Sequence, residues 1–159
     1  GVVEYGWLNA AQSIGAVIAA VVISQLGQIP RQGRLFLIAV VSFGVFTILF
    51  GLASSFLAAM LALVFVGASD SVSTIIRNTI RQLQTPDYIR GRMVSINQIF
   101  FTGGPQLGEV EAGVVAQIFG PVFAIISGGI GCLLAVGIIV RRWPQLRTYN
   151  GDEPIMSGR

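Results

Sequence analysis

The chain contains no histidine, no lysine and a single cysteine, and these absences narrow the chemistry open to it. Without histidine, zinc sites built on two or three imidazoles and the Ser-His or Cys-His pairs of nucleophilic enzymes are excluded. Cys132 cannot form an internal disulfide or a thiolate metal cluster, and we interpret it as a small apolar packing residue. We therefore expect no metal site, no cofactor and no enzymatic activity.

Charge is also scarce: 11% of the 159 residues are charged, whereas 53% are hydrophobic. Soluble domains carry about 25% charged residues, and a soluble fold of this size could not cover itself with so few. The sequence therefore predicts an all-α integral membrane protein, a polytopic helix bundle that contacts membrane lipid. The basic residues stand at the ends of apolar runs and form no separate basic domain, so we expect no nucleic-acid partner.

Five apolar segments approach or exceed the roughly 20 residues that a bilayer-spanning helix needs. We predict helices over about residues 7–26, 35–52, 56–76, 93–119 and 122–140. The second of these holds only Ser42 and Thr47 as polar residues, so we expect it to be largely lipid-facing. Glycines 128, 129, 131 and 137 in the last segment suggest close helix packing.

The distribution of the arginines predicts on which side of the membrane each segment begins and ends. Nine of the ten fall within residues 31–34, 77–92 and 141–147, and the tenth is Arg159 at the end of the tail, whereas the opposite ends, at 1–6, 53–55 and 119–121, hold none. Because basic residues collect on the cytoplasmic side of a membrane, we expect the N-terminus outside and the C-terminus in the cytoplasm.

Polar residues within the first apolar segment recur at helical spacing alongside small ones. In hydrocarbon, such a stripe marks either a helix interface or a water-filled cavity, and the sequence leaves both interpretations open. The stripe consists of Asn9, Gln12, Ser13, Ala16, Ala20 and Ser24. Further cavity-lining candidates, in the fourth segment, are Asn97, Gln98 and Gln106.

Asp70 lies inside the third segment, about 15 Å along a helix from Arg81, and an ionisable residue at that depth is a functional candidate. We expect it to be buried, on one face with Ser73, Thr74, Arg77 and Arg81. Burial of a carboxylate favours its protonated form, which suits proton coupling. The alternative is that Asp70 only pairs with an arginine.

Glu109 and Glu111 are the other proton-coupling candidates. They stand two positions apart, about 200° around a helix, so a regular helix cannot place both on one face. The alternative for both is exposure at the outer surface.

Two further features concern movement. A cytoplasmic gate could be built from Arg77, Arg81, Asp87, Arg90 and Arg92. The alternative is that these arginines only fix the topology. Gly103-Gly104-Pro105 interrupts the fourth segment, and such a break is either a hinge or a static kink.

Two short motifs connect the chain to a known family. Thr85-Pro86-Asp87 followed by Arg90-Gly91-Arg92 resembles the loop between the tenth and eleventh helices of major facilitator superfamily exporters. The match continues through Leu107-Gly108-Glu109-Val110-Glu111-Ala112-Gly113 and Gly120-Pro121. This combination is similar to the branch that holds enterobactin exporters and macrolide efflux pumps.

The resemblance implies that residues 1–149 form the last five helices of a twelve-helix transporter and that 150–159 form a cytoplasmic tail. The start at Gly1, without Met or a signal-peptide pattern, fits part of a longer protein whose N-terminal half is missing here. The resemblance further implies proton-coupled export of a small amphiphilic molecule, such as a siderophore or drug, across a bacterial inner membrane. The alternatives are a solute uptake symporter of the same fold and a membrane scaffold subunit that transports nothing.

Overall fold

The computed structural model describes residues 1–27, 31–84 and 107–147, with side chains up to residue 80 in the second range. Its long helices are α1 (Val2–Gln25), α2 (Gln32–Leu52), α3 (Phe56–Gln84) and α5 (Pro121–Arg142), and residues 107–119 are also helical. A short 3₁₀ helix, η2 (Pro144–Arg147), follows α5. These ranges contain no strand, and the all-α prediction is confirmed.

Four helices are long and apolar enough to cross a membrane: α1, α2, α3 over Phe56–Ile80, and α5. Local chemistry explains where they begin. The hydroxyl of Ser55 accepts a hydrogen bond from the Ala58 amide at 3.3 Å and so caps the start of α3. Pro121 occupies the first position of α5, where its missing N–H costs nothing. The arginines at 141 and 142 lie in the last turn of α5, where positive charge complements the helix dipole.

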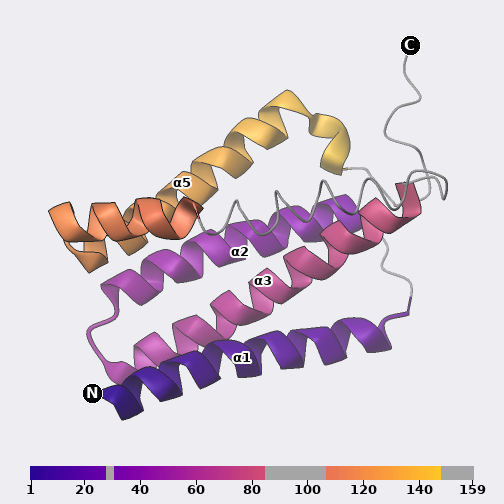
Figure 1. The fold of residues 1–159 in the computed structure, drawn as a ribbon. Helices are drawn as coiled ribbons and strands as arrows, with labels where there is room; N and C mark the ends of the chain where they lie inside the picture. The colour runs from indigo at the N-terminus through magenta and orange to yellow at the C-terminus, as the bar shows by residue number, and fades with distance from the viewer. Residues whose placement is uncertain (28–30, 85–106, 148–159) are drawn as a thin grey trace.

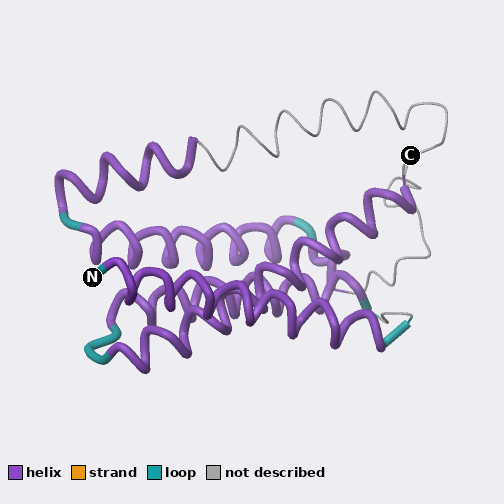
Figure 2. The backbone as a smooth tube through the Cα atoms, turned by 60° about the horizontal axis from the view of Figure 1, so that its bottom comes forward, coloured by secondary structure: helices purple, strands orange, loops and turns teal. Residues whose placement is uncertain are grey.

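The helices lie side by side and alternate in direction (Figures 1 and 2). α1 and α3 run the same way, and α2 runs against them. α3 packs against both α1 and α2, and α2 packs against both α3 and α5. The expectation that residues 35–52 would be largely lipid-facing is therefore wrong in part, because α2 has a helix on two sides. An all-apolar sequence does not show which of its faces a neighbouring helix covers.

The contact between α1 and α3 is a backbone contact. A Cβ atom built on Gly15 of α1 would overlap the carbonyl oxygen of Val64 on α3, and one built on Gly67 of α3 would overlap the carbonyl oxygen of Gln12. The two glycines therefore let the helices approach until backbone meets backbone. In lipid, helices associate through such close packing, because lipid tails are as apolar as the side chains and give little hydrophobic drive.

A second small-residue contact joins α2 to α5. A Cβ atom on Gly129 would lie 2.6 Å from Cγ1 of Ile48 and 2.9 Å from the carbonyl oxygen of Gly44. Among the described residues, Gly129 makes a close contact, whereas a Cβ atom on Gly128, Gly131 or Gly137 would meet no described atom within 4 Å. Spacing in the sequence showed that small residues were present but not which of them faced α2.

Aromatic stacking adds to the contact between α2 and α3. The rings of Phe46 and Phe65 stack with their centroids 4.5 Å apart. Few large side chains are enclosed, and Ile76 on α3 is the one that is fully buried among the described residues. The bundle is thus held mainly by small residues, in line with the packing of helices in membranes.

We expect Gly15→Ala to destabilise the protein by roughly 1–3 kcal/mol, because even one methyl group at this contact forces the helices apart. The matched control is Gly6→Ala on the same helix, where an added Cβ meets nothing within 4 Å. Alanine there should be neutral or stabilising, by up to about 1 kcal/mol from helix propensity. Thermal unfolding of the detergent-solubilised protein measures both. Equal midpoints for the two variants would contradict the backbone contact.

Candidate functional site

The surface of α1 divides into three sectors. Ala11, Gly15, Ala19 and Ile23 are buried and follow one another at spacing of four, on the side that meets α3. The polar residues Asn9, Gln12 and Ser13 are exposed in a second sector, in which Gln12 lies next to the contact and Asn9 and Ser13 lie further round the helix. The remaining exposed sector is aliphatic and consists of Ile14, Val17, Ile18, Val21 and Val22. Different residues therefore make the helix contact, and the polar part of the stripe is left uncovered by the described helices.

On α3 the predicted polar face is divided. Asp70 is exposed on the described helices, and its burial in a longer protein stays a prediction. Ser73, by contrast, is buried at 8% exposure, as is Ser69. Thr74 is half-buried, and its hydroxyl accepts a hydrogen bond of 3.2 Å from Nη2 of Arg77. Asp70, Thr74 and Arg77 thus form an uncovered polar line at spacing of four and three.

The polar edges of α1 and α3 lie on the same side of this helix pair. Asp70 lies three residues after Gly67, about 60° back around α3, whereas Gln12 lies one residue after Ala11, about 100° forward around α1. On two parallel helices, opposite rotations away from their shared contact lead to the same side of the pair. Since α1 and α3 run in the same direction, the line on α3 continues from the level of Gln12 toward the C-terminal end of α3 (Figure 1). We call this set the polar track: Asn9, Gln12, Ser13, Asp70, Thr74 and Arg77.

The length of the polar track can be compared with the thickness of the hydrocarbon core of a membrane. Gly67 and Arg77 are ten residues apart, or about 15 Å along the helix axis at 1.5 Å per residue. The hydrocarbon core of a bilayer is about 30 Å thick. The track therefore covers about half of that depth, on helices whose other exposed faces are apolar.

The polar track does not include the other predicted site residues. Glu109 and Glu111 are both exposed, on the helix over residues 107–119. Arg81 lies in α3, but its side chain is not described. The remaining candidates lie outside the described residues: Asp87, Arg90, Arg92, Asn97, Gln98, Gly103, Gly104, Pro105 and Gln106.

The described residues offer no group of three His, Cys, Asp or Glu side chains that could hold a metal ion. The sulfur of Cys132 lies 3.7 Å from the carbonyl oxygen of Val40, a contact between α5 and α2. The polar track provides amide, hydroxyl, carboxylate and guanidinium groups. Such groups can form hydrogen bonds to polar parts of a small molecule.

Comparison with known proteins gives this arrangement its context. The family model described as "Transmembrane secretion effector", of the major facilitator superfamily, matches residues 1–156. The chain belongs to this family. Two relatives named Enterobactin exporter EntS match nearly the whole chain: that of Citrobacter koseri is 25% identical over 155 residues, and that of Escherichia coli (strain SMS-3-5) is 26% identical over 154 residues. No solved structure matches the chain with significance.

The chain covers 98% and 97% of its own length in these two matches but 37% of each relative. A third relative with the same name, from Shigella boydii serotype 18, is 28% identical over 151 residues. The resemblance to the enterobactin exporter branch is thereby confirmed. Together with the four apolar helices, membership of the secretion effector family makes the chain part of a multi-pass membrane protein. The names of the family and the relatives describe transporters and not enzymes.

If the polar track borders water in the assembled protein, cysteines placed on it should react quickly with a charged thiol reagent. We expect Ser13→Cys and Thr74→Cys to be modified much faster than Ile18→Cys, because the aliphatic sector of α1 faces lipid, which excludes charged reagents. Cys132→Ala provides the background in full-length protein in vesicles. Mass spectrometry of the modified fraction measures the rates. Equal rates at Ser13 and Ile18 would contradict a water-lined track.

Proposed function

We propose that the chain forms the C-terminal half of a secondary-active exporter in a bacterial inner membrane. The observation that carries this proposal is the polar track, which places a carboxylate within a helix long and apolar enough to cross a membrane, in a secretion effector family member. A carboxylate at the bilayer centre costs about 2.5–3.5 kcal/mol on insertion scales. An acidic residue kept at such a position is expected to have a function.

We assign proton coupling to Asp70, with Glu109 or Glu111 as a second acid. In an exporter driven by a proton gradient, the acid binds a proton when it faces outside and loses it when it faces the cytoplasm. The substrate moves in the opposite direction. Asp70 lies at an uncovered edge of α3, where the remaining part of a longer chain and the substrate could reach it. Thr74 and Arg77, which share a hydrogen bond, supply polar and positive groups one and two turns away.

The chemistry of the track fits a small amphiphilic substrate. The amide and hydroxyl groups of Asn9, Gln12 and Ser13 can donate and accept hydrogen bonds, and they stand beside apolar side chains of the same helix. The relatives are named as enterobactin exporters, and enterobactin is a siderophore. We extend this to the present chain as export of a siderophore or a drug-like molecule. The substrate, protons and the N-terminal half of the same protein are then its partners.

The decisive experiment is Asp70→Asn in the full-length protein. We expect normal membrane insertion but loss of proton-driven substrate accumulation in inverted vesicles, because the amide keeps the size of the side chain and cannot take up a proton. Glu4→Gln, an exposed acid at the start of α1, is the matched control and should transport normally. Proton release on addition of substrate, measured in detergent between about pH 6 and 8, reports coupling directly.

The result also separates the alternatives. A membrane scaffold would accumulate no substrate in inverted vesicles with either aspartate or asparagine at position 70, and that outcome would remove the transport proposal. A solute uptake symporter of the same fold would accumulate substrate in right-side-out vesicles and not in inverted ones. Transport that loses its proton dependence only in the Glu109→Gln or Glu111→Gln variants would move the coupling acid away from α3.

The proposed orientation, with the C-terminus in the cytoplasm, can be tested separately. Ser55, before α3, and Pro121, at the start of α5, stand at ends without arginine, whereas Leu146 lies in η2 beside the arginines of the opposite end. In a Cys132→Ala background on intact cells, Ser55→Cys and Pro121→Cys should react with an impermeant thiol reagent. Leu146→Cys should react only after the membrane is opened. The reverse pattern would overturn the orientation.

A further inference from the structure

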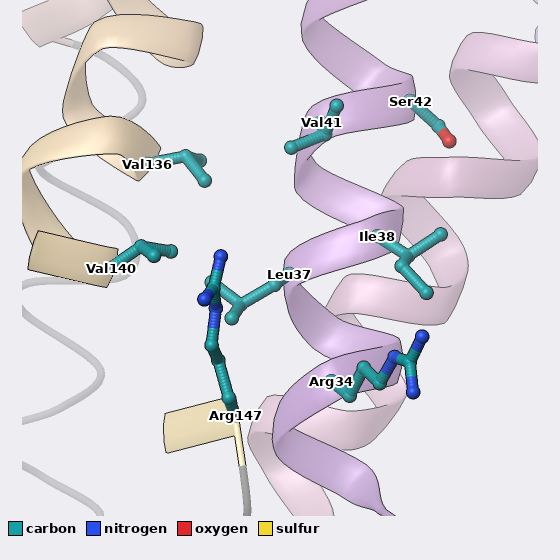
Figure 3. Close-up of a pocket in the computed structure, with 8 residues that line it drawn as sticks. All are labelled: Arg34, Leu37, Ile38, Val41, Ser42, Val136, Val140 and Arg147. Carbon is teal, nitrogen blue, oxygen red and sulfur yellow. The ribbon is translucent and has the colours of Figure 1, made fainter. Parts of the chain in front are cut away.

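A groove with a cavity volume of about 530 Å³ runs between α2 and α5, away from the polar track (Figure 3). Its floor and walls are five aliphatic side chains from the two helices, among them Leu37 and Val41 of α2 and Val140 of α5. The polar side chains that line it are two arginines and one serine. An apolar groove with charge at one end suits an amphiphile.

The two arginines stand at the same end of the groove. Arg34 lies in the first turn of α2, and Arg147 is the last residue of η2, just beyond α5. In Figure 3, the side chain of Arg147 points toward the aliphatic side chains that line the groove, whereas the guanidinium group of Arg34 points away from them. Among the described residues neither forms an ion pair with a carboxylate. The positive charge there is therefore available to an anionic ligand.

The dimensions of the groove fit a lipid. Ser42 is eight residues from Arg34, so its level lies about 12 Å further into the membrane, two turns along α2. A headgroup phosphate at the arginines would thus place the first part of an acyl chain against Leu37 and Val41. Guanidinium groups bind phosphate through paired charge-assisted hydrogen bonds, and basic pockets between membrane helices bind anionic headgroups.

We propose that this groove is a binding site for an anionic phospholipid, with its phosphate at Arg147, at the end of the groove to which Arg34 adds positive charge, and one acyl chain between α2 and α5. The charge at the mouth selects an anionic over a zwitterionic lipid. The aliphatic walls select a lipid over a free phosphate. The site is distinct from the polar track, which lies on α1 and α3, so the proposal does not depend on the transport function.

The test is native mass spectrometry of the full-length protein, released from detergent after incubation with phosphatidylglycerol or phosphatidylcholine. We expect phosphatidylglycerol to be retained and the double variant Arg34→Gln, Arg147→Gln to lower its apparent affinity by roughly tenfold or more, since each surface arginine attracts anionic lipid. The matched control is Arg141→Gln, Arg142→Gln. It removes two exposed arginines at the same membrane end that do not line the groove, and should change the affinity less than twofold.

A third variant separates lipid from free phosphate. Val41→Trp fills the groove and keeps both arginines, so it should also lower retention of phosphatidylglycerol while leaving the weak binding of soluble glycerol phosphate unchanged. Several outcomes would overturn the site. These are equal losses in the two double variants, equal retention of the two lipids by the parent protein, and full retention by Val41→Trp. Equal losses of affinity in the two double variants would show that phosphatidylglycerol is attracted by all the arginines at this end of the helices and not by the groove.

Discussion

The backbone contact between α1 and α3 is the constraint on which the rest of the arrangement depends. Two glycines, Gly15 and Gly67, bring these helices together until no Cβ atom fits between them. In hydrocarbon there is little hydrophobic gain on association, so van der Waals contact at this short range supplies much of the stabilisation. The same contact also fixes the rotation of each helix about its axis. It therefore decides that Gln12 and Thr74 stand on one side and the aliphatic residues of α1 on another.

The helices themselves could be predicted from hydropathy, and the four described spans agree with the predicted segments to within several residues. The largest difference is the end of α3, which continues to Gln84 instead of stopping near residue 76. The predicted end followed the appearance of Arg77, but an arginine is a good helix former and does not end a helix. The nearest residue that resists helical continuation is Pro86, which also restricts the residue before it.

The site was harder to predict, because polarity along a sequence does not show which side a neighbour covers. Asp70 and Ser73 are three residues apart and were assigned to one face, yet the carboxylate is exposed and the hydroxyl is buried. A helical wheel places them about 60° apart, which is enough to separate a contact from a free surface. The groove between α2 and α5 was missed for a related reason. In the sequence, the groove is marked only by Arg34 and Ser42, eight residues apart. The site also needs Arg147, which the fold places at the same end of the groove as Arg34.

The exposure of Asp70 strengthens the case for a functional track. An aspartate facing lipid from this part of α3 would carry the full cost of a charge in hydrocarbon, whereas the same residue facing water or polar groups would not. The described helices do not cover it, and the chain spans only 37% of the length of the relatives it matches. We therefore expect the other helices of a longer chain, or an aqueous cavity, on the side of the described helices that bears Asp70, Asn9 and Gln12. In transporters built from repeated halves, substrate sites lie at such a junction.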